Sequence, residues 1–377
     1  MRHVYVLGVG MVPFGRYPNT PVEDLGAEAV LAALGDAGIP ATALAAAYCG
    51  HVSQGMTLGE RILDRAGLAG IPTTNVENAC ASSSTALNAA WLAVAAGQYD
   101  AVVVMGAEKM RRGLLPLTRL AEGDLEGLLG KTIPSLSALF ASRYAAEYGL
   151  TSEDLAAVAV KNSRHAAHNP YAQYRRPLTV DEVLASPMIS TPLTQLMCCP
   201  TSDGASAVVV GSGRYARRQR SRAVRIVRSH LQGGVCIGTR STPNVTARAA
   251  RQAYELAGIG PEDVDVAEGL DYTTMAEILL YEDLGLVGPG EGVKVVRNGG
   301  QTGRRRFVFS PGGGLLGRGH PLGATGVAQV AEIVWQLRGE AGERQVPGAR
   351  VGLTHAAGGV ITGVDDEASV TVHLLAR

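Results

Sequence analysis

The stretch DLGAEAVLAALGDAGIPATALAAAYCG, residues 24–50, decides the fold because a later stretch of the chain repeats its pattern. The later copy, TARAARQAYELAGIGPEDVDVAEGLD, spans residues 246–271. Each reads as a helix, a turn and a short buried strand. Each helix ends at a glycine followed by isoleucine, Gly38 in one copy and Gly258 in the other, and both glycines are expected to be left-handed caps. The strands that follow end in register, so we predict an internal duplication.

Outside these copies, short apolar runs alternate with helical runs over most of the chain. HVYVLGVG (3–10), YDAVVVMGAE (99–108) and ARVGLTHAA (349–357) are typical of strands. Continuous apolar strands separated by helices indicate a parallel or mixed sheet that is covered on both faces. The sequence therefore predicts an α/β protein.

The alternation stops between the two copies, where residues 111–187 are rich in Arg, Leu, Tyr and short polar turns. This stretch is predicted to be a mostly helical insertion, and insertions on a rigid scaffold often contact substrate. We predict three units: an N-terminal half (1–110 plus 188–220), the insertion (111–187) and a C-terminal half (221–377).

Composition excludes several classes of function. The 377 residues carry a formal net charge of zero and no basic block, which argues against nucleic acid as a partner. No apolar run reaches the roughly 18 to 20 residues of a membrane helix, and no signal peptide is expected at the start. The five cysteines show no metal-type pairing, so we predict free thiols, no metal site and a cytoplasmic location.

Cys80 is the first candidate for chemistry. It lies in VENACASSST (76–85), between a strand-like run and a long alanine-rich helical run. The amide groups and dipole at the start of a helix favour an anion, so a lowered thiol pKa is expected there. The alternative is that Cys80 is an inert small residue of the core.

His320 is the second candidate, at the centre of the glycine-dense loop SPGGGLLGRGHPLGATG (310–326). Glycines let a backbone approach a ligand closely, and Pro321 suits the start of a helix. Central elements of a duplicated fold meet, so the thiol of one half and the imidazole of the other are expected to converge. Such a Cys–His pair can activate the sulfur. A satisfied core histidine is the alternative.

With these segments in view, the chain resembles the thiolase superfamily. It is most similar to the sterol-carrier-protein-type and the bacterial or archaeal thiolase-like acyltransferases. The segments that carry the resemblance run in family order over nearly the whole chain: NVENACASSSTALNAA, VVVMGAEKM, NPYAQYR, CCPTSDGASAVVV, GLLGRGHPLGATGVAQ and GLTHAAGG.

The resemblance implies a duplicated, five-layered αβαβα fold with a loop domain in the 111–187 region. It implies acyl-CoA substrates, a role in lipid metabolism, and no bound cofactor. Cys80 would be the acylated nucleophile and His320 the base. The backbone N–H of Cys80 and one from Gly358–Gly359 would form an oxyanion hole. A homodimer or tetramer is also implied.

The chain departs from the family pattern on the carbon–carbon side of the chemistry. No thiol stands in THAAGGV (354–360), where thiolases carry a second cysteine in Cys-x-Gly. The His-Asp-Cys-Phe motif of the sterol-carrier branch becomes Leu270, Asp271 and Tyr272, so one oxyanion donor is missing. Ordinary Claisen condensation or thiolysis is therefore doubtful.

Three side chains are candidates to replace the missing groups. Tyr272 could donate a proton or simply line the pocket. His355 could be an acid/base, although a structural histidine at this place is the favoured reading. His51 lies in a loop that approaches the nucleophile in the family.

Three functions follow from these residues. The leading one is a CoA-thioester-dependent acyltransferase that forms an acyl-Cys80 intermediate. The second is a retro-aldolase that acts on acyl-CoA with a zinc-ribbon/OB-fold partner protein, and the third is a non-catalytic acyl-CoA-binding scaffold. Several arginines could meet CoA phosphates, although solvated surface is the favoured reading: Arg111, Arg112, Arg175, Arg176 and Arg304 to Arg306.

Overall fold

A ten-stranded sheet runs through the molecule, and its strand order is symmetric about the middle. The computed structural model describes all residues except 111–126, 128, 220–221, 235–242, 300–306 and 361–365. The order is β10-β9-β11-β12-β8-β1-β7-β4-β2-β3, with the two halves joined where β1 pairs with β8. In each half, antiparallel pairs come first and two parallel pairs follow towards the edge.

The strands of the first half come from both sides of the predicted insertion, and those of the second half come from the residues after 221. The first half contains β1 (Val4–Met11), β7 (Gly204–Ser212), β4 (Ala101–Glu108), β2 (Ala46–Gly50) and β3 (Thr73–Val76). The second half contains β8 (Val224–Gly233), β12 (Glu367–Ala376), β11 (Val351–Val360), β9 (Val266–Glu268) and β10 (Val308–Phe309).

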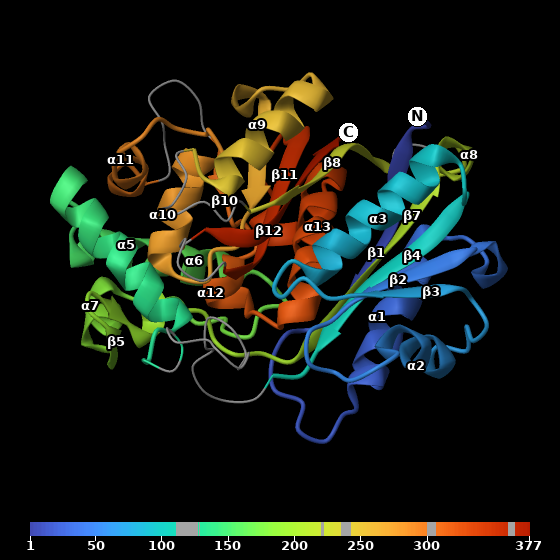
Figure 1. Ribbon diagram of the computed structural model, residues 1–377, viewed down its shortest axis with the longest axis horizontal. Coiled ribbons are helices and arrows are strands. Elements are labelled where there is room, and N and C mark those ends of the chain that lie inside the picture. Colours follow the sequence, from blue (N-terminus) through green and yellow to red (C-terminus); the bar gives the residue numbers. More distant parts are fainter. Residues whose placement is uncertain (111–126, 128, 220–221, 235–242, 300–306, 361–365) are drawn as a thin grey trace.

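Helices cover both halves and fill the space between them (Figure 1). The central pair is α3 (Ser82–Ala96) and α13 (Leu322–Arg338), whose side chains are buried around nearly the whole circumference. Helices that are this apolar belong inside a protein. The outer layers are α1 (Val22–Ala37) with α2 (Leu58–Arg65), and α9 (Val245–Ala257) with α10 (Thr274–Asp283). The predicted five-layered αβαβα fold is confirmed.

The repeated stretches that predicted the duplication match in detail. Helix α1 ends at Gly38 with φ of 60°, and α9 ends at Gly258 with φ of 66°. Both are left-handed caps, a conformation that glycine adopts without strain. A short 3-10 turn follows each cap, Ala41–Ala43 or Pro261–Asp263, and leads into β2 or β9. The two strands begin at the same distance from their cap glycines, but β2 continues to Gly50 whereas β9 ends at Glu268. The predicted register therefore holds for the strand starts and not for their ends.

The described part of the insertion is mostly helical. It contains α5 (Ile133–Tyr148), α6 (Ser152–Ala167) and α7 (Val180–Ala185), each of which begins after a threonine N-cap with reciprocal capping bonds. A separate two-stranded sheet of β5 (Met188–Ser190) and β6 (Leu193–Thr194) follows, then a 3-10 turn, Gln195–Met197. The remaining helices are short: α8 (Gly213–Ala216), α11 (Gly292–Arg297), α12 (Gly314–Arg318) and the 3-10 turn Gly342–Arg344.

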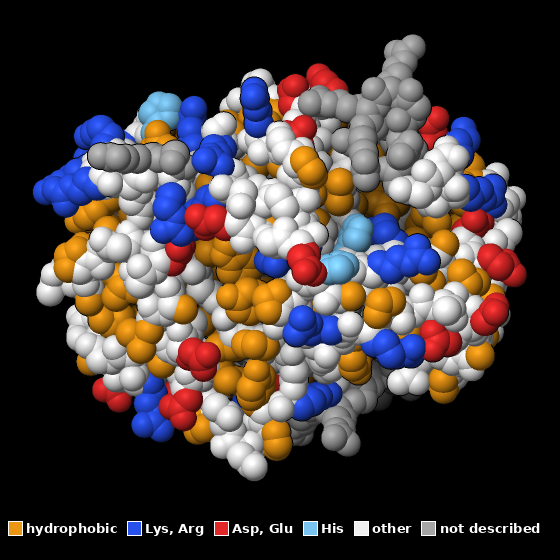
Figure 2. All heavy atoms as spheres, turned by 180° about the vertical axis from the view of Figure 1, so that it is seen from behind, with side chains coloured by type: hydrophobic (Ala, Val, Ile, Leu, Met, Phe, Trp, Pro, Cys, Tyr) orange, Lys and Arg blue, Asp and Glu red, His pale blue; other side chains and the backbone are white. Residues whose placement is uncertain are grey.

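Charges are mixed on the surface. On the face drawn in Figure 2, Lys and Arg side chains are interspersed with Asp and Glu, as the zero net charge leads one to expect. None of the helices in the described residues combines the length and apolar character needed to cross a membrane. Within those same residues, no three His, Cys, Asp or Glu side chains are grouped to hold a metal ion.

Candidate active site

Cys80 lies in a tight turn between β3 and α3. Ala79, directly before it, has φ of 46°, a left-handed conformation that costs free energy for any residue with a Cβ. The turn is closed by hydrogen bonds from the Ala81 N–H to the Asn78 carbonyl (2.9 Å) and from the Ser82 N–H to the Ala79 carbonyl (3.1 Å). Strained backbone of this kind is typical of positions where a side chain is held for function.

The backbone of β11 packs directly against this turn at Gly358. A Cβ placed on Gly358 would lie 1.9 Å from the Asn78 carbonyl oxygen and 3.0 Å from the Ala81 nitrogen. Gly359 follows with φ of 69° and lines the same cavity as Cys80. The structure therefore brings together the backbone of the three residues for which an oxyanion hole was predicted, and their roles remain a prediction.

Replacing Gly358 with alanine is expected to displace the Cys80 turn, because the new Cβ would overlap the Asn78 carbonyl oxygen. We expect the rate of Cys80 acylation to fall at least about 100-fold, the scale of a misplaced reacting group. Gly35→Ala is the control, since no atom lies within 4 Å of its Cβ position in helix α1. Equal acylation rates for the two variants would contradict this packing.

His320 stands between α12 and α13, and its hydrogen bonds define which ring nitrogen carries the proton. The Nδ1 atom lies 2.8 Å from the Thr325 hydroxyl oxygen, and that hydroxyl donates its own proton to the Pro321 carbonyl (2.9 Å). A hydroxyl has one proton, so Thr325 must accept from Nδ1–H. The lone pair of the neutral ring is therefore on Nε2, and among the described contacts no hydrogen bond occupies that atom.

A cavity of about 1580 Å³ receives both candidate groups. Cys80 and His320 line it together with Leu270, Tyr272 and His355. Much of the remaining wall is apolar. It comes from the insertion (Ile133, Phe140, Leu178), the 3-10 turn Gln195–Met197 (Leu196), α10 (Leu279) and α12 (Leu316). The structure thus places the predicted thiol and imidazole, one from each half, in the wall of one cavity, and their catalytic roles remain a prediction.

The expected low pKa of the Cys80 thiol is wrong. Burial raises the pKa of Cys80 to about 12, and the negative charges of Glu108 and Glu77 act in the same direction. Burial also lowers the pKa of His320 to about 3, helped by the positive charge of Arg318. Desolvation outweighs the helix end here. The resting pair is a neutral thiol and a neutral imidazole, so the proton must move during attack.

Of the other candidates, His355 has no free ring nitrogen. Its Nδ1 accepts a long hydrogen bond from the Leu270 N–H (3.5 Å), and its Nε2 lies 3.1 Å from the Thr246 hydroxyl. With Nδ1 accepting, the proton is on Nε2. This arrangement supports the structural reading of His355.

His51 is not among the residues that line the cavity. Its Cα lies 2.6 Å from the position of a Cβ on Gly323, and its Nδ1 has no hydrogen-bond partner within the described part of the chain. Tyr272 does face the cavity. The structure therefore places Tyr272 in the cavity wall together with Cys80, and His51 outside that wall.

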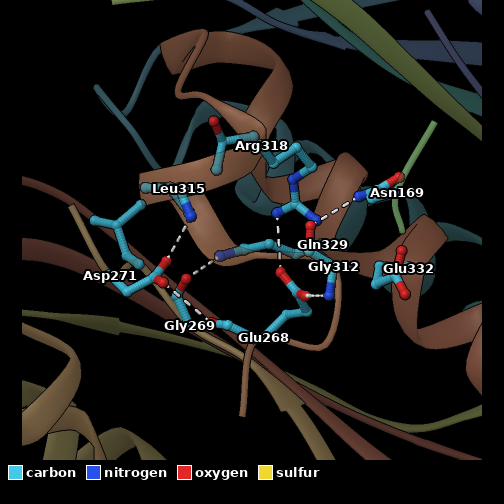
Figure 3. Close-up of polar contacts among 12 residues, drawn as sticks. Asn169, Glu268, Gly269, Asp271, Gly312, Leu315, Arg318, Gln329 and Glu332 are labelled. Atoms are coloured by element: carbon cyan, nitrogen blue, oxygen red, sulfur yellow. Dashed lines mark hydrogen bonds and ion pairs between the residues drawn. The ribbon is translucent and has the colours of Figure 1, made fainter. Parts of the chain in front are cut away.

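Buried charged side chains, which the sequence reasoning did not use, hold the glycine-dense loop from beneath (Figure 3). Asp271 accepts hydrogen bonds from the Leu315 N–H (2.8 Å) and the Ser310 hydroxyl (3.1 Å). Arg318 and Glu268 form an ion pair at 2.9 Å, and both side chains are at most 1% exposed. Burial raises the pKa of Asp271 well above its usual value, and the Glu277 charge adds to this.

Glu108 is a further residue that the sequence reasoning missed. It is fully buried at the end of β4 and accepts hydrogen bonds from the Val52 N–H (2.8 Å), the Ser53 N–H (3.0 Å) and the Gly323 N–H (3.2 Å). It thereby ties the loop after β2 to the start of α13. A charged residue that ends a run of buried apolar residues was the available signal.

Three fully buried histidines are expected to make the protein sensitive to acid. Burial lowers the pKa of His320 and His355 to about 3 and that of His373 to about 4. The unfolded chain binds protons below about pH 6.5, so stability is complete above that pH and falls as the pH drops towards the folded-state values. Each histidine contributes a slope of about 1.4 kcal/mol per pH unit. Asp271, whose pKa is raised by burial, contributes a slope of the opposite sign.

His373→Gln is expected to reduce that slope by about 1.4 kcal/mol per pH unit between pH 6 and 5. The free energy of unfolding from urea titrations at fixed protein concentration measures it. An unchanged slope in the variant would show that His373 is not held neutral in the folded protein.

Comparisons with known proteins agree with this geometry. A family model described as "Thiolase, N-terminal domain" matches residues 4–214, and one described as "Thiolase C-terminal domain-like" matches residues 238–369. An acetyl-CoA acetyltransferase of Methanothermobacter thermautotrophicus is 41% identical over 389 residues, and the match covers 100% of this chain and 100% of that protein.

Two further similarities bear on the branch of the family. Sterol carrier protein 2 of Homo sapiens is 38% identical over 383 residues, which cover 95% of this chain and 70% of that protein. A solved structure of the Ltp2-ChsH2(DUF35) aldolase has a TM-score of 0.83 and 26% identity, with coverage of 100% of this chain and 98% of that one.

The chain belongs to the thiolase family. It is an enzyme of the acyltransferase kind, and the predicted resemblance and enzyme class are confirmed.

Two of the arginines considered for CoA phosphates, Arg175 and Arg176, line the cavity. Arg176 is already paired with Glu182 at 2.7 Å. The others, Arg111, Arg112 and Arg304 to Arg306, lie outside the described residues, as does Cys236.

Proposed function

We propose that this chain transfers an acyl group from a coenzyme A thioester through an intermediate in which Cys80 is acylated. The observation that carries the proposal is the shared cavity: it receives the Cys80 side chain from one half and His320, with its Nε2 lone pair uncommitted, from the other. An acyl-CoA provides a thioester carbonyl that a thiol can attack.

The chemistry follows from the resting protonation states. His320 Nε2 takes the Cys80 proton as the sulfur attacks the carbonyl carbon, because neither group is charged beforehand. The backbone N–H groups of Cys80 and of Gly358–Gly359 in β11 then stabilise the oxyanion. Collapse of the tetrahedral intermediate expels the CoA thiolate and leaves acyl-Cys80. An acceptor completes the transfer by making or breaking a carbon–carbon bond.

A quenched reaction with a panel of acyl-CoAs, analysed by intact-protein mass, tests the proposal. We expect a mass increase equal to one acyl group, located on Cys80 by peptide mapping. A protein that remains unmodified by every acyl-CoA in the panel, short, long and aromatic, would remove the proposal.

Thr325→Val is expected to slow acylation about 10- to 100-fold without loss of the fold, because the Nδ1–H of His320 loses its acceptor. Thr246→Val removes the corresponding hydroxyl beside His355 and serves as the matched control, with an expected change below about threefold. Single-turnover acylation rates measure both. Equal effects would mean that the two histidines have equivalent roles.

A retro-aldol cleavage is the second candidate, and Tyr272 is the observation that favours it. This phenol lines the cavity beside the nucleophile, and the Ltp2-ChsH2(DUF35) aldolase has a similar fold at 26% identity. In that case a zinc-ribbon/OB-fold partner would be required. Tyr272→Phe would then abolish cleavage while Cys80→Ala would not, and the reverse result selects the acyltransferase.

We further propose that the protein acts as a homodimer or tetramer. β3 is the edge strand of the sheet and directly precedes the Cys80 turn, so association there would order the turn. Sedimentation equilibrium of the full chain tests this proposal.

A further inference from the structure

A second thiol, Cys199, faces the cavity that contains Cys80. It belongs to the segment between the 3-10 turn Gln195–Met197 and β7, and it lines the cavity wall. Cys80, Cys199 and Tyr272 pack against the same apolar core of the second half. Burial raises the pKa of the Cys199 thiol well above its usual value.

The backbone of this segment is fixed at both ends by the site. The Cys199 N–H donates to the Tyr272 carbonyl at 2.9 Å, and Cys198 forms a bridge with Thr273. Further on, Thr201 forms a bridge with His320. Cys199 therefore stands between the segment after β9 and the catalytic imidazole.

Three other polar side chains of the cavity, His355, His320 and Glu77, already have a partner or a proposed role. Both nitrogens of His355 have partners, and His320 serves Cys80 in the proposed acylation. Glu77 accepts from the Ala79 N–H at 2.8 Å and so supports the turn. These assignments leave Cys199 and Tyr272 as the candidates for the group that takes a proton from the carbon next to a thioester carbonyl.

We propose that Cys199 is that group, a second catalytic thiol that moves a proton at the α-carbon of the acceptor acyl-CoA. The assignment depends on the acyl-Cys80 function proposed above. In this assignment the second thiol comes from the segment that contains Cys199. Residues 272, 355 and 356, where the family carries its second cysteine, are not cysteines in this chain.

The proton and bond balance of the step is complete within the site. During acylation the Cys80 proton passes to His320, and the departing CoA thiolate takes the proton of Cys199. The Cys199 thiolate then removes a proton from the α-carbon of a second acyl-CoA. The resulting carbanion attacks the acyl-Cys80 carbonyl, the carbon–carbon bond forms and the Cys80 carbon–sulfur bond breaks. The Cys80 thiolate recovers its proton from His320, and the reverse sequence describes cleavage.

The burial of Cys199 suits this role. A thiol with a raised pKa stays protonated at rest, and its thiolate, once formed beside the substrate, is a stronger base than an exposed thiolate.

Exchange of α-hydrogens with D₂O tests the proposal on the full chain. The protein is incubated with acetyl-CoA, propionyl-CoA and phenylacetyl-CoA, and deuterium in the recovered thioester is measured by mass spectrometry. We expect the wild type to catalyse exchange and Cys199→Ser to lose it by at least about 100-fold. Acyl-Cys80 is still expected to form in the variant on the same samples, because a solvent proton can replace that of Cys199 on the departing CoA thiolate.

Cys198→Ser is the matched control, because Cys198 is a neighbouring thiol of the cavity wall. Its effect on the rate of α-hydrogen exchange is expected to be below about threefold. Thermal unfolding of Cys199→Ser and Cys199→Ala shows that the fold is retained, and Cys199→Ala is used if the serine variant is unfolded. Exchange that survives in a folded Cys199 variant overturns the proposal, as does its absence from a wild type that acylates Cys80. Exchange lost only in Tyr272→Phe assigns the role to the phenol and overturns it too. A wild type that never acylates Cys80 instead contradicts the proposed function.

Discussion

Cys80→Ala is expected to abolish formation of the acyl-enzyme and to lower turnover with any acyl-CoA by at least about 10⁴-fold. The expected loss is large because nothing else in the described cavity combines a nucleophile with the His320 base and with the backbone of Gly358–Gly359 in β11. Stability should change by less than about 1.5 kcal/mol, since the side chain is half-buried and one sulfur atom is removed.

Two measurements check this expectation. Intact mass after quenching shows whether any acyl group remains attached, and the free energy of unfolding shows that the fold is intact. Cys49→Ala is the matched control, because Cys49 is a fully buried thiol in the core of the first half and away from the cavity. A Cys80→Ala protein that still carries an acyl adduct would mean that another nucleophile accepts the substrate.

Glu268→Gln is expected to cost about 3 to 5 kcal/mol of unfolding free energy, the second large effect. The substitution leaves the Arg318 guanidinium buried at 1% exposure without its carboxylate partner at 2.9 Å. Removal of one partner of a buried ion pair is far more costly than removal of both. The loop that presents His320 should loosen with it, since the Gly312 N–H also donates to Glu268 (3.2 Å).

A double-mutant cycle separates the cost of the unpaired charge from that of lost packing. Arg318→Leu combined with Glu268→Gln should recover most of the lost stability, because the unpaired charge is then absent. Glu255→Gln is the control for an exposed pair: Arg251 and Glu255 lie 3.9 Å apart with more than 60% of each side chain exposed. Its cost should be below about 0.5 kcal/mol. A similar cost for the two glutamate variants would contradict the buried pair.

Local pattern predicted the architecture because the determinants of the fold are short-range. The glycine caps at Gly38 and Gly258 and the apolar runs of the strands are each visible within a few residues, and their repetition predicts the two halves. Cys80 and His320 could be chosen for the same reason. Each lies in a segment of unusual composition, small residues around Cys80 and glycines around His320, although the structure shows that several of these residues also allow close packing, such as Gly326 against Ser84.

What failed depends on contacts between distant segments. The pKa of Cys80 moves upward because of the protein that surrounds it, whereas the sequence shows only the helix that follows. In the sequence, Asp271 stands out only because it matches the aspartate of the His-Asp-Cys-Phe motif. In the structure, its carboxyl holds the glycine-dense loop. The sequence does not predict a role for Cys199, because its place in the wall of the Cys80 cavity depends on the pairing of its segment with Tyr272 and on the approach of that segment to His320.

The most direct measurement is the burst of free CoA when wild type and His320→Gln are mixed with excess acyl-CoA in a stopped-flow instrument. If the Cys80 thiol and the His320 imidazole act on one carbonyl, the wild-type burst should release about one CoA per site. The burst of His320→Gln should be at least about 100-fold slower. Bursts of equal rate in both proteins, or no burst in the wild type, would contradict the pairing of this sulfur with this imidazole.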